Sequence, residues 1–143
     1  MIVDNTLVFS DSQAVTATAR STNIVDIGAP GTPAGMTNPV RRDIGVGTEI
    51  PISIRITEAF NNLTSLTFQL EVDDDPAFGS PKIVAVSRAI PLASLGLGAR
   101  IPFPVELPEG IDERFVGLRY TVTGTAPTTG KVFAAITAGD QQQ

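Results

Sequence analysis

The stretch that decides the fold expected for this chain is Arg114–Thr137, which reads RFVGLRYTVTGTAPTTGKVFAAIT. Apolar and other residues alternate over Val116–Thr123, with the period of two that is typical of a half-buried strand. Gly124–Gly130 has turn composition, and the alternation resumes in Lys131–Thr137. The pattern predicts a β-hairpin that forms the core of a sheet.

The two faces of this expected hairpin differ in character. If Thr123 pairs with Lys131, the only tyrosine, Tyr120, lies opposite Ala134, and both apolar rows fall on the same side of the sheet. The other side carries Arg119 and Phe133, and it is amphipathic. We expect that side to be accessible and to form a contact surface within the sandwich or an oligomer, and not an active site.

Composition indicates a fold built from many short strands. The chain has 143 residues, with Gly 13 and Pro 11 punctuating stretches rich in β-branched residues. We expect a single domain over residues 1–143, an all-β, two-sheet antiparallel β-sandwich with one or two short helical turns. A jelly-roll topology is preferred to an immunoglobulin-like one.

The expected elements follow from local periodicity and from turn residues. About eight strands are expected. They are Met1–Phe9 (alternatively an extended arm), Ala14–Ala19, Asn23–Ile27, Ile50–Ile56, Ser65–Asp73, Lys82–Ser87 and the two strands of the hairpin. Glu58–Leu63 is expected to be a helical turn or a loop, Pro91–Leu97 a helical turn that starts at Pro91, and Ile101–Val105 an extended edge or crossing segment.

The segment Gly28–Gly47, GAPGTPAGMTNPVRRDIGVG, shows no sustained period and is long for a connection in a compact domain. It is either a surface connection or an extended contact arm, and the second is slightly favoured. Its candidate contact residues are Met36, Val40, Arg41 and Arg42. The arginines are either solvated or paired with carboxylates of a neighbouring protein. Residues 139–143 are expected to be a disordered tail.

Charge and residue types exclude several functions. The net charge of −5 disfavours nucleic-acid binding, no apolar run approaches a membrane span, and the N-terminus lacks a signal-peptide pattern, so we expect synthesis and retention in a cytosol. The chain has no histidine and no cysteine, so an enzyme, a cofactor site and catalytic residues are not expected. Asp73–Asp75 is interpreted as a solvated turn in preference to a calcium site, and no metal is expected.

A resemblance extends over nearly the whole chain. It rests on Leu66–Leu95, which holds an acidic turn followed by Phe78 and later Ile90-Pro91-Leu92. It also rests on Gly117-Leu118-Arg119-Tyr120, on Thr129-Gly130-Lys131-Val132, and on the opening with Asp4, Asn5 and Ser10–Ala14. In these features the chain resembles the capsid cement, or decoration, proteins of short-tailed bacteriophages.

The resemblance implies a structural virion protein, made in the host cytoplasm and placed on the outer capsid surface. Such proteins bind the assembled shell and bridge subunits of the major capsid protein. The implied partners are that protein and the chain itself, as a homo-oligomer. An exposed strand edge would favour a symmetric dimer over a trimer, although a trimer fits the same residues. The main alternative is a carbohydrate- or cell-surface-binding β-sandwich module, and the shortage of aromatic residues counts against it. An enzyme that uses carboxylates alone is the third hypothesis.

Overall fold

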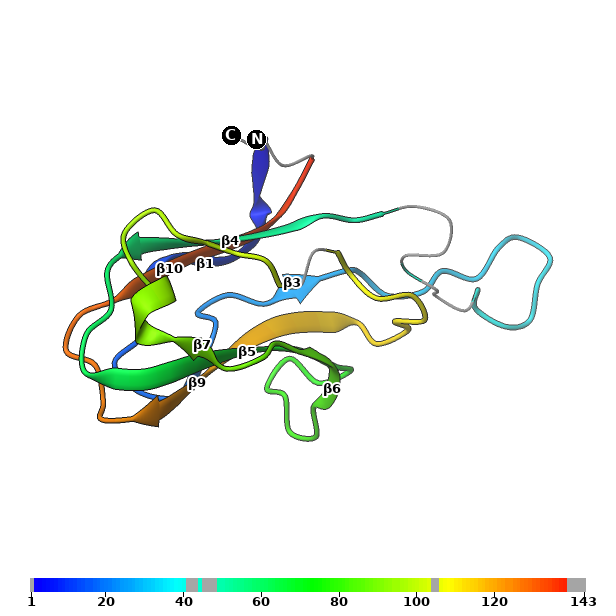
Figure 1. The fold of residues 1–143 in the computed structure, drawn as a ribbon. Helices are drawn as coiled ribbons and strands as arrows, with labels where there is room; N and C mark the ends of the chain where they lie inside the picture. Colours follow the sequence, from blue (N-terminus) through cyan, green and yellow to red (C-terminus); the bar gives the residue numbers. More distant parts are fainter. Residues whose placement is uncertain (1, 41–43, 45–48, 104–105, 139–143) are drawn as a thin grey trace.

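The computed structural model describes residues 2–40, 44, 49–103 and 106–138, and two antiparallel sheets face each other across one core (Figure 1). Sheet A has the order β1 (Val3–Ala14), β10 (Lys131–Thr137), β4 (Ile52–Glu58) and β8 (Arg100–Ile101). Sheet B has the order β2 (Ala19–Arg20), β9 (Phe115–Gly124), β5 (Leu63–Asp73) and β6 (Lys82–Val86). Two short strands complete sheet B, β3 (Val25–Asp26) beside β9 and β7 (Ile90–Pro91) beside β5.

The strand order is that of a jelly roll. β2 and β3 both pair with β9, and β6 and β7 both pair with β5, so each sheet is effectively four strands wide. Among successive strands of the described chain, only β5 and β6 pair directly, because the other connections lead to a different sheet or a non-adjacent position. This arrangement is the double Greek key of a jelly roll. The predicted antiparallel β-sandwich with jelly-roll topology is therefore confirmed.

The predicted hairpin is wrong, although both of its strands exist. β9 pairs with β5 and with β2, so Tyr120 lies beside Phe68 and Ala19. β10 lies between β1 and β4 in the opposite sheet. Gly124–Gly130 therefore crosses between the sheets, since alternation specifies which face of a strand is buried and leaves its pairing partner open. The two apolar rows meet across the core, and they do not lie side by side in one sheet.

Several element boundaries also differ from the predictions. Ala14–Ala19 is not a strand, because β1 ends at Ala14 and the N–H of Val15 turns to donate to the carbonyl of Gly130, 3.1 Å away. Pro91 flanks the short 3₁₀ helix η1 (Leu92–Ser94) and is not its first residue. Of the expected edge or crossing segment Ile101–Val105, residues 101–103 are described. Ile101 belongs to the edge strand β8, as expected, and the strand ends before Pro102, a residue with no N–H to donate to a ladder.

The remaining expectations are met or fall outside the described residues. Val3–Phe9 of the expected strand Met1–Phe9 belongs to β1, while Met1 lies outside the described residues. Of the two interpretations of Glu58–Leu63 the loop is correct, with Asn62 at φ 62°. The tail 139–143 lies outside the residues that the structure describes. No helix in the described ranges is long and apolar enough to cross a bilayer.

The core lies between the inner faces of the two sheets. Its fully buried side chains include Phe9, Ile54, Phe68, Leu118 and Tyr120. Phe68 and Tyr120 meet edge to face, with ring centroids 5.6 Å apart. Burying this apolar row from both sheets supplies the main driving force for holding them together.

A buried polar chain ties sheet B to sheet A. The hydroxyl of Tyr120 donates to Ser10 Oγ at 2.7 Å, and Ser10 Oγ donates to Gln13 Oε1 at 2.6 Å. Gln13 also accepts from the N–H of Thr22 and donates to the carbonyl of Arg20, so the chain extends to the start of sheet B. Burial raises the pKa of Tyr120, so this phenol stays protonated and serves as a structural link.

Candidate contact surfaces

The first candidate surface is the loop Gly28–Val40, which leaves one end of the sandwich (Figure 1). Every residue from Ala29 to Val40 is exposed, including Met36 at 61% and Val40 at 55%. Two hydrogen bonds close the loop on itself, from the N–H of Val40 to the carbonyl of Gly31 at 3.0 Å and from that of Met36 to Pro33 at 3.1 Å. The loop thus presents two apolar side chains to solvent, while the predicted contacts Arg41 and Arg42 lie outside the described residues.

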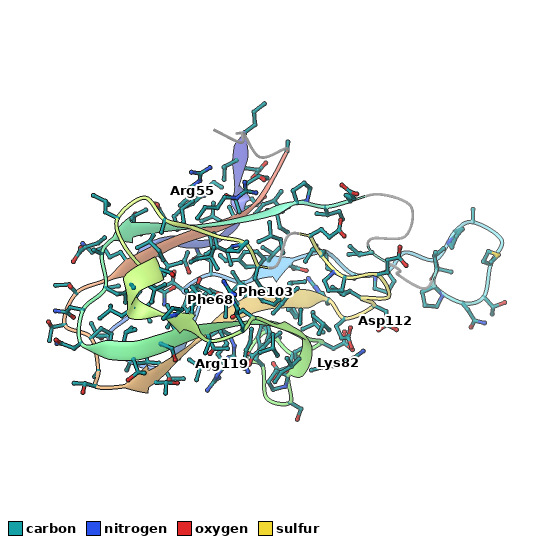
Figure 2. All side chains as sticks on the ribbon, in the orientation of Figure 1. Arg55, Phe68, Lys82, Phe103, Asp112 and Arg119 are labelled. Atoms are coloured by element: carbon teal, nitrogen blue, oxygen red, sulfur yellow. The ribbon has the colours of Figure 1, made fainter. Side chains whose placement is uncertain are left out.

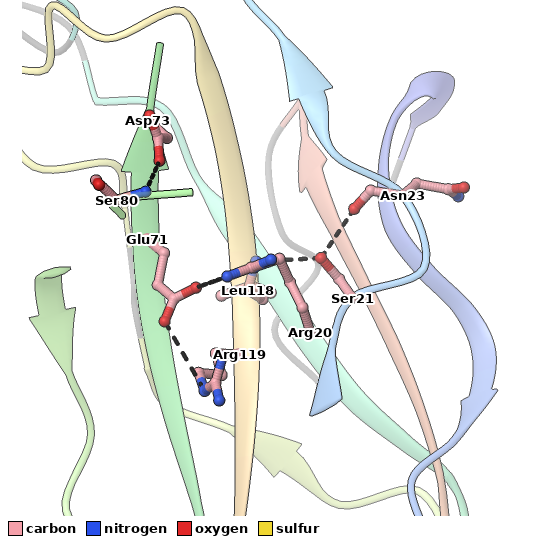
Figure 3. Close-up of polar contacts among 8 residues, drawn as sticks. All are labelled: Arg20, Ser21, Asn23, Glu71, Asp73, Ser80, Leu118 and Arg119. Atoms are coloured by element: carbon pink, nitrogen blue, oxygen red, sulfur yellow. Dashed lines mark hydrogen bonds and ion pairs between the residues drawn. The ribbon is translucent and has the colours of Figure 1, made fainter. Parts of the chain in front are cut away.

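The second surface is the outer face of sheet B, which centres on a buried carboxylate (Figure 3). Glu71 on β5 is 2% exposed, and its Oε2 accepts from Nε of Arg20 and lies 3.0 Å from Nη2 of the same residue. Arg119 on β9 lies on its other side, with Nε 4.0 Å from Oε1. Two guanidinium groups therefore lie against one carboxylate, which connects β2 and β9 to β5 on this face.

The acidic run Asp73–Asp75 forms the turn between β5 and β6. The carboxylate of Asp73 accepts backbone N–H groups from Asp75 and Ser80, both at 3.0 Å, and that of Asp75 accepts from Ala77 at 2.9 Å. These bonds, led by the one from Asp75, lower the pKa of Asp73 below its ordinary value. The carboxylates thus shape the turn, and no group of three potential metal ligands occurs among the described residues.

The same turn places Phe78 over sheet B. Phe78 adopts φ 53° and is 5% exposed. The guanidinium carbon of Arg20 lies 4.4 Å from its ring centroid. A side chain at Gly117 would meet this ring at 3.1 Å, so the glycine makes room for it. Glu71, Arg20 and Phe78 therefore form one stack that fixes the turn to the outer face of sheet B.

The third surface is the edge strand β6. Its exposed apolar residues are Ile83 at 51% and Val86 at 50%. The sequence predicts the strand Lys82–Ser87 here and indicates no contact role for it. Both apolar side chains are exposed because a β-bulge interrupts the pairing with β5, and the residues of β6 alone do not reveal this bulge.

Arg119 and Phe133 do not share a face, contrary to the prediction from the hairpin. Arg119 lies on the outer face of sheet B, while Phe133 lies beside Arg55 on the outer face of sheet A. Figure 2 shows Arg55 and Arg119 on opposite sides of the sandwich. On the face of sheet A, the hydroxyls of Ser53 and Thr137 are buried without a hydrogen-bond partner among the described residues. The two predicted contact residues therefore belong to separate surfaces.

The aromatic residues offer little surface for stacking. Tyr120 and five of the seven phenylalanines are buried, and Phe103 and Phe133 are half-buried. An aromatic platform for a sugar requires an exposed ring face, so the alternative of a carbohydrate-binding module has no such platform in this arrangement.

Comparisons with known proteins place the chain in a family. A search among curated proteins finds no match. The model of the Bbp16 family matches residues 9–136, a range that begins within β1, ends within β10 and includes all three candidate surfaces. The chain therefore belongs to the Bbp16 family.

Proposed function

We propose that the protein is a capsid cement protein, which binds the outer surface of an assembled shell and bridges subunits of the major capsid protein. The resemblance described above suggests this role. The observation that carries the proposal is the exposed loop Ala29–Val40 on a firmly packed jelly roll. A cement protein needs a stable body and a contact element that reaches its neighbour, and we propose that the jelly roll and this loop are those two parts.

The loop is the proposed capsid contact. Met36 and Val40 are large apolar side chains held in water, and burying them against another protein is favourable. Arg41 and Arg42 follow directly in the sequence, and we propose that they pair with carboxylates of the shell. Together these residues give an apolar centre beside a charged rim, the usual composition of a protein interface.

Binding of this kind stabilises the shell by mass action. A protein that binds only the assembled lattice shifts the equilibrium toward assembly by the free energy of binding. Copies that associate with one another add avidity, which multiplies weak individual contacts. We therefore propose that the protein acts as a homo-oligomer, for which a dimer fits better than a trimer.

The first experiment is quantification of the protein in purified particles by gel electrophoresis and mass spectrometry. We expect a high copy number in a fixed ratio to the major capsid protein. In the second step, purified protein is added to shells that lack it, and disassembly by heat is followed by light scattering. We expect the midpoint to rise until the sites are filled. Absence from particles, or no change in the midpoint at saturating protein, would refute the proposal.

A further inference from the structure

Both ends of the exposed loop return to one short segment of the chain, Ile111–Arg114. The N–H of Ile27, before the loop, donates to the carbonyl of Arg114 at 3.0 Å. The N–H of Ile44, after the loop, donates to the carbonyl of Ile111 at 3.2 Å. The chain therefore leaves the sandwich and comes back beside the same segment, which is the geometry of an Ω-loop with adjacent ends.

The two ends of the loop are held by different kinds of contact. At the returning end, Ile111 is 1% exposed and belongs to the core, and Ile44 packs against that core. Burial of apolar side chains therefore fixes this end. The outgoing end follows β3, which has only two residues, and polar contacts at the surface hold it.

These polar contacts centre on Asp26 and Arg114, which we call the clamp. Nε of Arg114 donates to Oδ1 of Asp26 at 2.8 Å and Nη2 donates to Oδ2 at 2.7 Å, so the pair is bidentate. Oδ1 of Asp26 also accepts from the N–H of Gly28 at 2.8 Å. Gly28 has φ 82°, a conformation that favours glycine, and the chain turns into the loop there. The clamp thus ties this turn to the residue before β9.

Arg114 is itself held from two further directions. Its guanidinium carbon lies 5.0 Å from the ring centroid of Phe115, and its backbone N–H donates to Oδ1 of Asp74 at 3.1 Å. Phe115 is 8% exposed and begins β9, while Asp74 lies in the turn between β5 and β6. The direction of the arginine side chain is therefore fixed by sheet B and by the neighbouring turn.

The clamp has little influence on the stability of the core. Both of its side chains are 43% exposed. Exposed ion pairs contribute little to the free energy of unfolding, and salt screens them. Its main effect is therefore local, on the start of the loop.

We infer that Asp26 and Arg114 are positioning residues for the proposed capsid contact, because they fix the direction in which the loop leaves the body. Met36 and Val40 are thereby presented to the shell in a preset orientation. Ordering a loop on binding costs free energy, and the clamp removes part of that cost by fixing the base of the loop in advance. The tip of the loop still adapts to its neighbour. This inference deepens the proposed function and rests on it for the identity of the bound surface.

The first experiment measures the order of the loop in the free, purified chain by NMR relaxation of its backbone amides. Order parameters of about 0.85 are typical of a rigid backbone and values below about 0.6 of a flexible one. We expect Gly28 and Gly31 to lie near the upper value in the parent and to fall toward the lower one in Asp26→Arg and in Arg114→Asp. Ile44 should keep its parent value in both variants, because its anchor is in the core.

The second experiment measures binding of the same variants to shells by co-sedimentation. Each single reversal places like charges face to face, so we expect a dissociation constant about tenfold higher than that of the parent, with Tm close to the parent value. The two reversals change the net charge in opposite directions, so an effect of overall charge would move their binding in opposite directions.

The double variant Asp26→Arg/Arg114→Asp restores opposite charges at the base of the loop. We expect the order of the loop and the binding to recover in part, with a dissociation constant at least about threefold lower than in either single variant. Recovery is incomplete because an arginine at position 26 cannot accept the bond from the N–H of Gly28.

The matched control reverses one charge of a similarly exposed pair at the other end of the sandwich. β4 ends and β10 begins at the end opposite the loop (Figure 1), where Glu58 pairs with Lys131 and the side chains are 38% and 44% exposed. Glu58→Lys should leave both the order of the loop and the binding to shells unchanged.

Three outcomes would overturn the inference. They are loop amides that keep their parent order in both single variants, single variants with a mobile loop that bind shells as tightly as the parent, and a double variant that recovers neither property. The relaxation measurement uses free protein, so it is independent of the shells. A parent chain that does not bind shells would refute the proposed function, whereas a loop ordered in the parent and mobile in both single variants would still support the clamp.

Discussion

The loop Ala29–Val40 and the edge strand β6 expose similar apolar side chains in different ways. Met36 and Val40 are 61% and 55% exposed, and Ile83 and Val86 are 51% and 50% exposed. Two backbone hydrogen bonds of the loop, from Val40 to Gly31 and from Met36 to Pro33, are formed within the loop itself. β6 is hydrogen-bonded to β5, and Val84 and Ala85 attach it to the core.

The difference shows that exposure alone does not define a contact surface. A partner of the loop must bear the entropic cost of fixing the loop, which reduces the affinity gained from the buried area. A partner of β6 meets a strand whose conformation is already fixed, but only a strand with a matching order of faces fits it. The loop can therefore adapt to the shape of a neighbour, whereas β6 accepts only a strand that matches its fixed order of faces.

The largest expected effect comes from removing the loop. Deleting Pro33–Pro39 should abolish particle binding, because it removes Met36 and its surroundings. The fold should be kept, since the N–H of Val40 already lies 3.0 Å from the carbonyl of Gly31 and the chain can close across the gap. Co-sedimentation with shells measures the binding, and thermal unfolding measures the fold.

The control for this deletion is the double substitution Met36→Ala/Val40→Ala, which keeps the loop length. It should weaken particle binding and leave both the unfolding temperature and the dimer unchanged. Retention of full particle binding by the deletion variant would show that the capsid contact lies elsewhere in the chain. The exposed loop would then have no role in binding the shell.

A smaller effect is expected from Glu71, which lies beside Ile83 of β6 in the neighbouring strand β5. Glu71→Gln removes the only carboxylate between Arg20 and Arg119 in the described structure, at a position 2% exposed. Breaking a buried ion pair leaves uncompensated charge, so we expect a loss of about 2–3 kcal/mol and a fall in Tm of about 5–10 °C. Differential scanning calorimetry measures the change.

The matched control is Glu58→Gln, which breaks the ion pair with Lys131, 2.6 Å long and partly exposed on both sides. Exposed pairs contribute little to stability, so its Tm should stay close to that of the parent. Equal effects from the two variants would contradict the assignment of Glu71 as the anchor of this face.

The smallest effect concerns the turn before β6. The pKa of Asp73 is lowered by hydrogen bonds from the backbone, so its folded-state value lies below the ordinary 3.8. The resulting stabilisation is present above the pKa of the unfolded chain and disappears as pH falls through the folded-state value. We expect Asp73→Asn to lower Tm slightly at neutral pH, and the difference from the parent to vanish once the pH has fallen below the folded-state pKa of Asp73. A difference that persists in acid would contradict this origin.

Much of the fold could be predicted from residue order. The alternation in Ile50–Ile56 and Ser65–Asp73 predicted the strands that the structure shows as β4 and β5, and the abundance of turns without helical periodicity indicated a sandwich. The prediction failed at Arg114–Thr137, where a seven-residue connection was interpreted as a hairpin turn and instead joins the two sheets. Of the predicted contact residues, Met36 and Val40 prove exposed, while their role as contacts stays a prediction.

The sequence by itself determined which face of β4, β5, β9 and β10 packs against the core, because burial depends on the two-residue period of the backbone and on side-chain hydrophobicity. It also determined the exposed, proline-rich loop, since no apolar period was present there to pack. Only the tertiary structure decided which strands are neighbours, because pairing joins segments far apart in the chain. That pairing placed Arg119 and Phe133 on opposite faces, and it introduced the bulge that turns both Ile83 and Val86 outward.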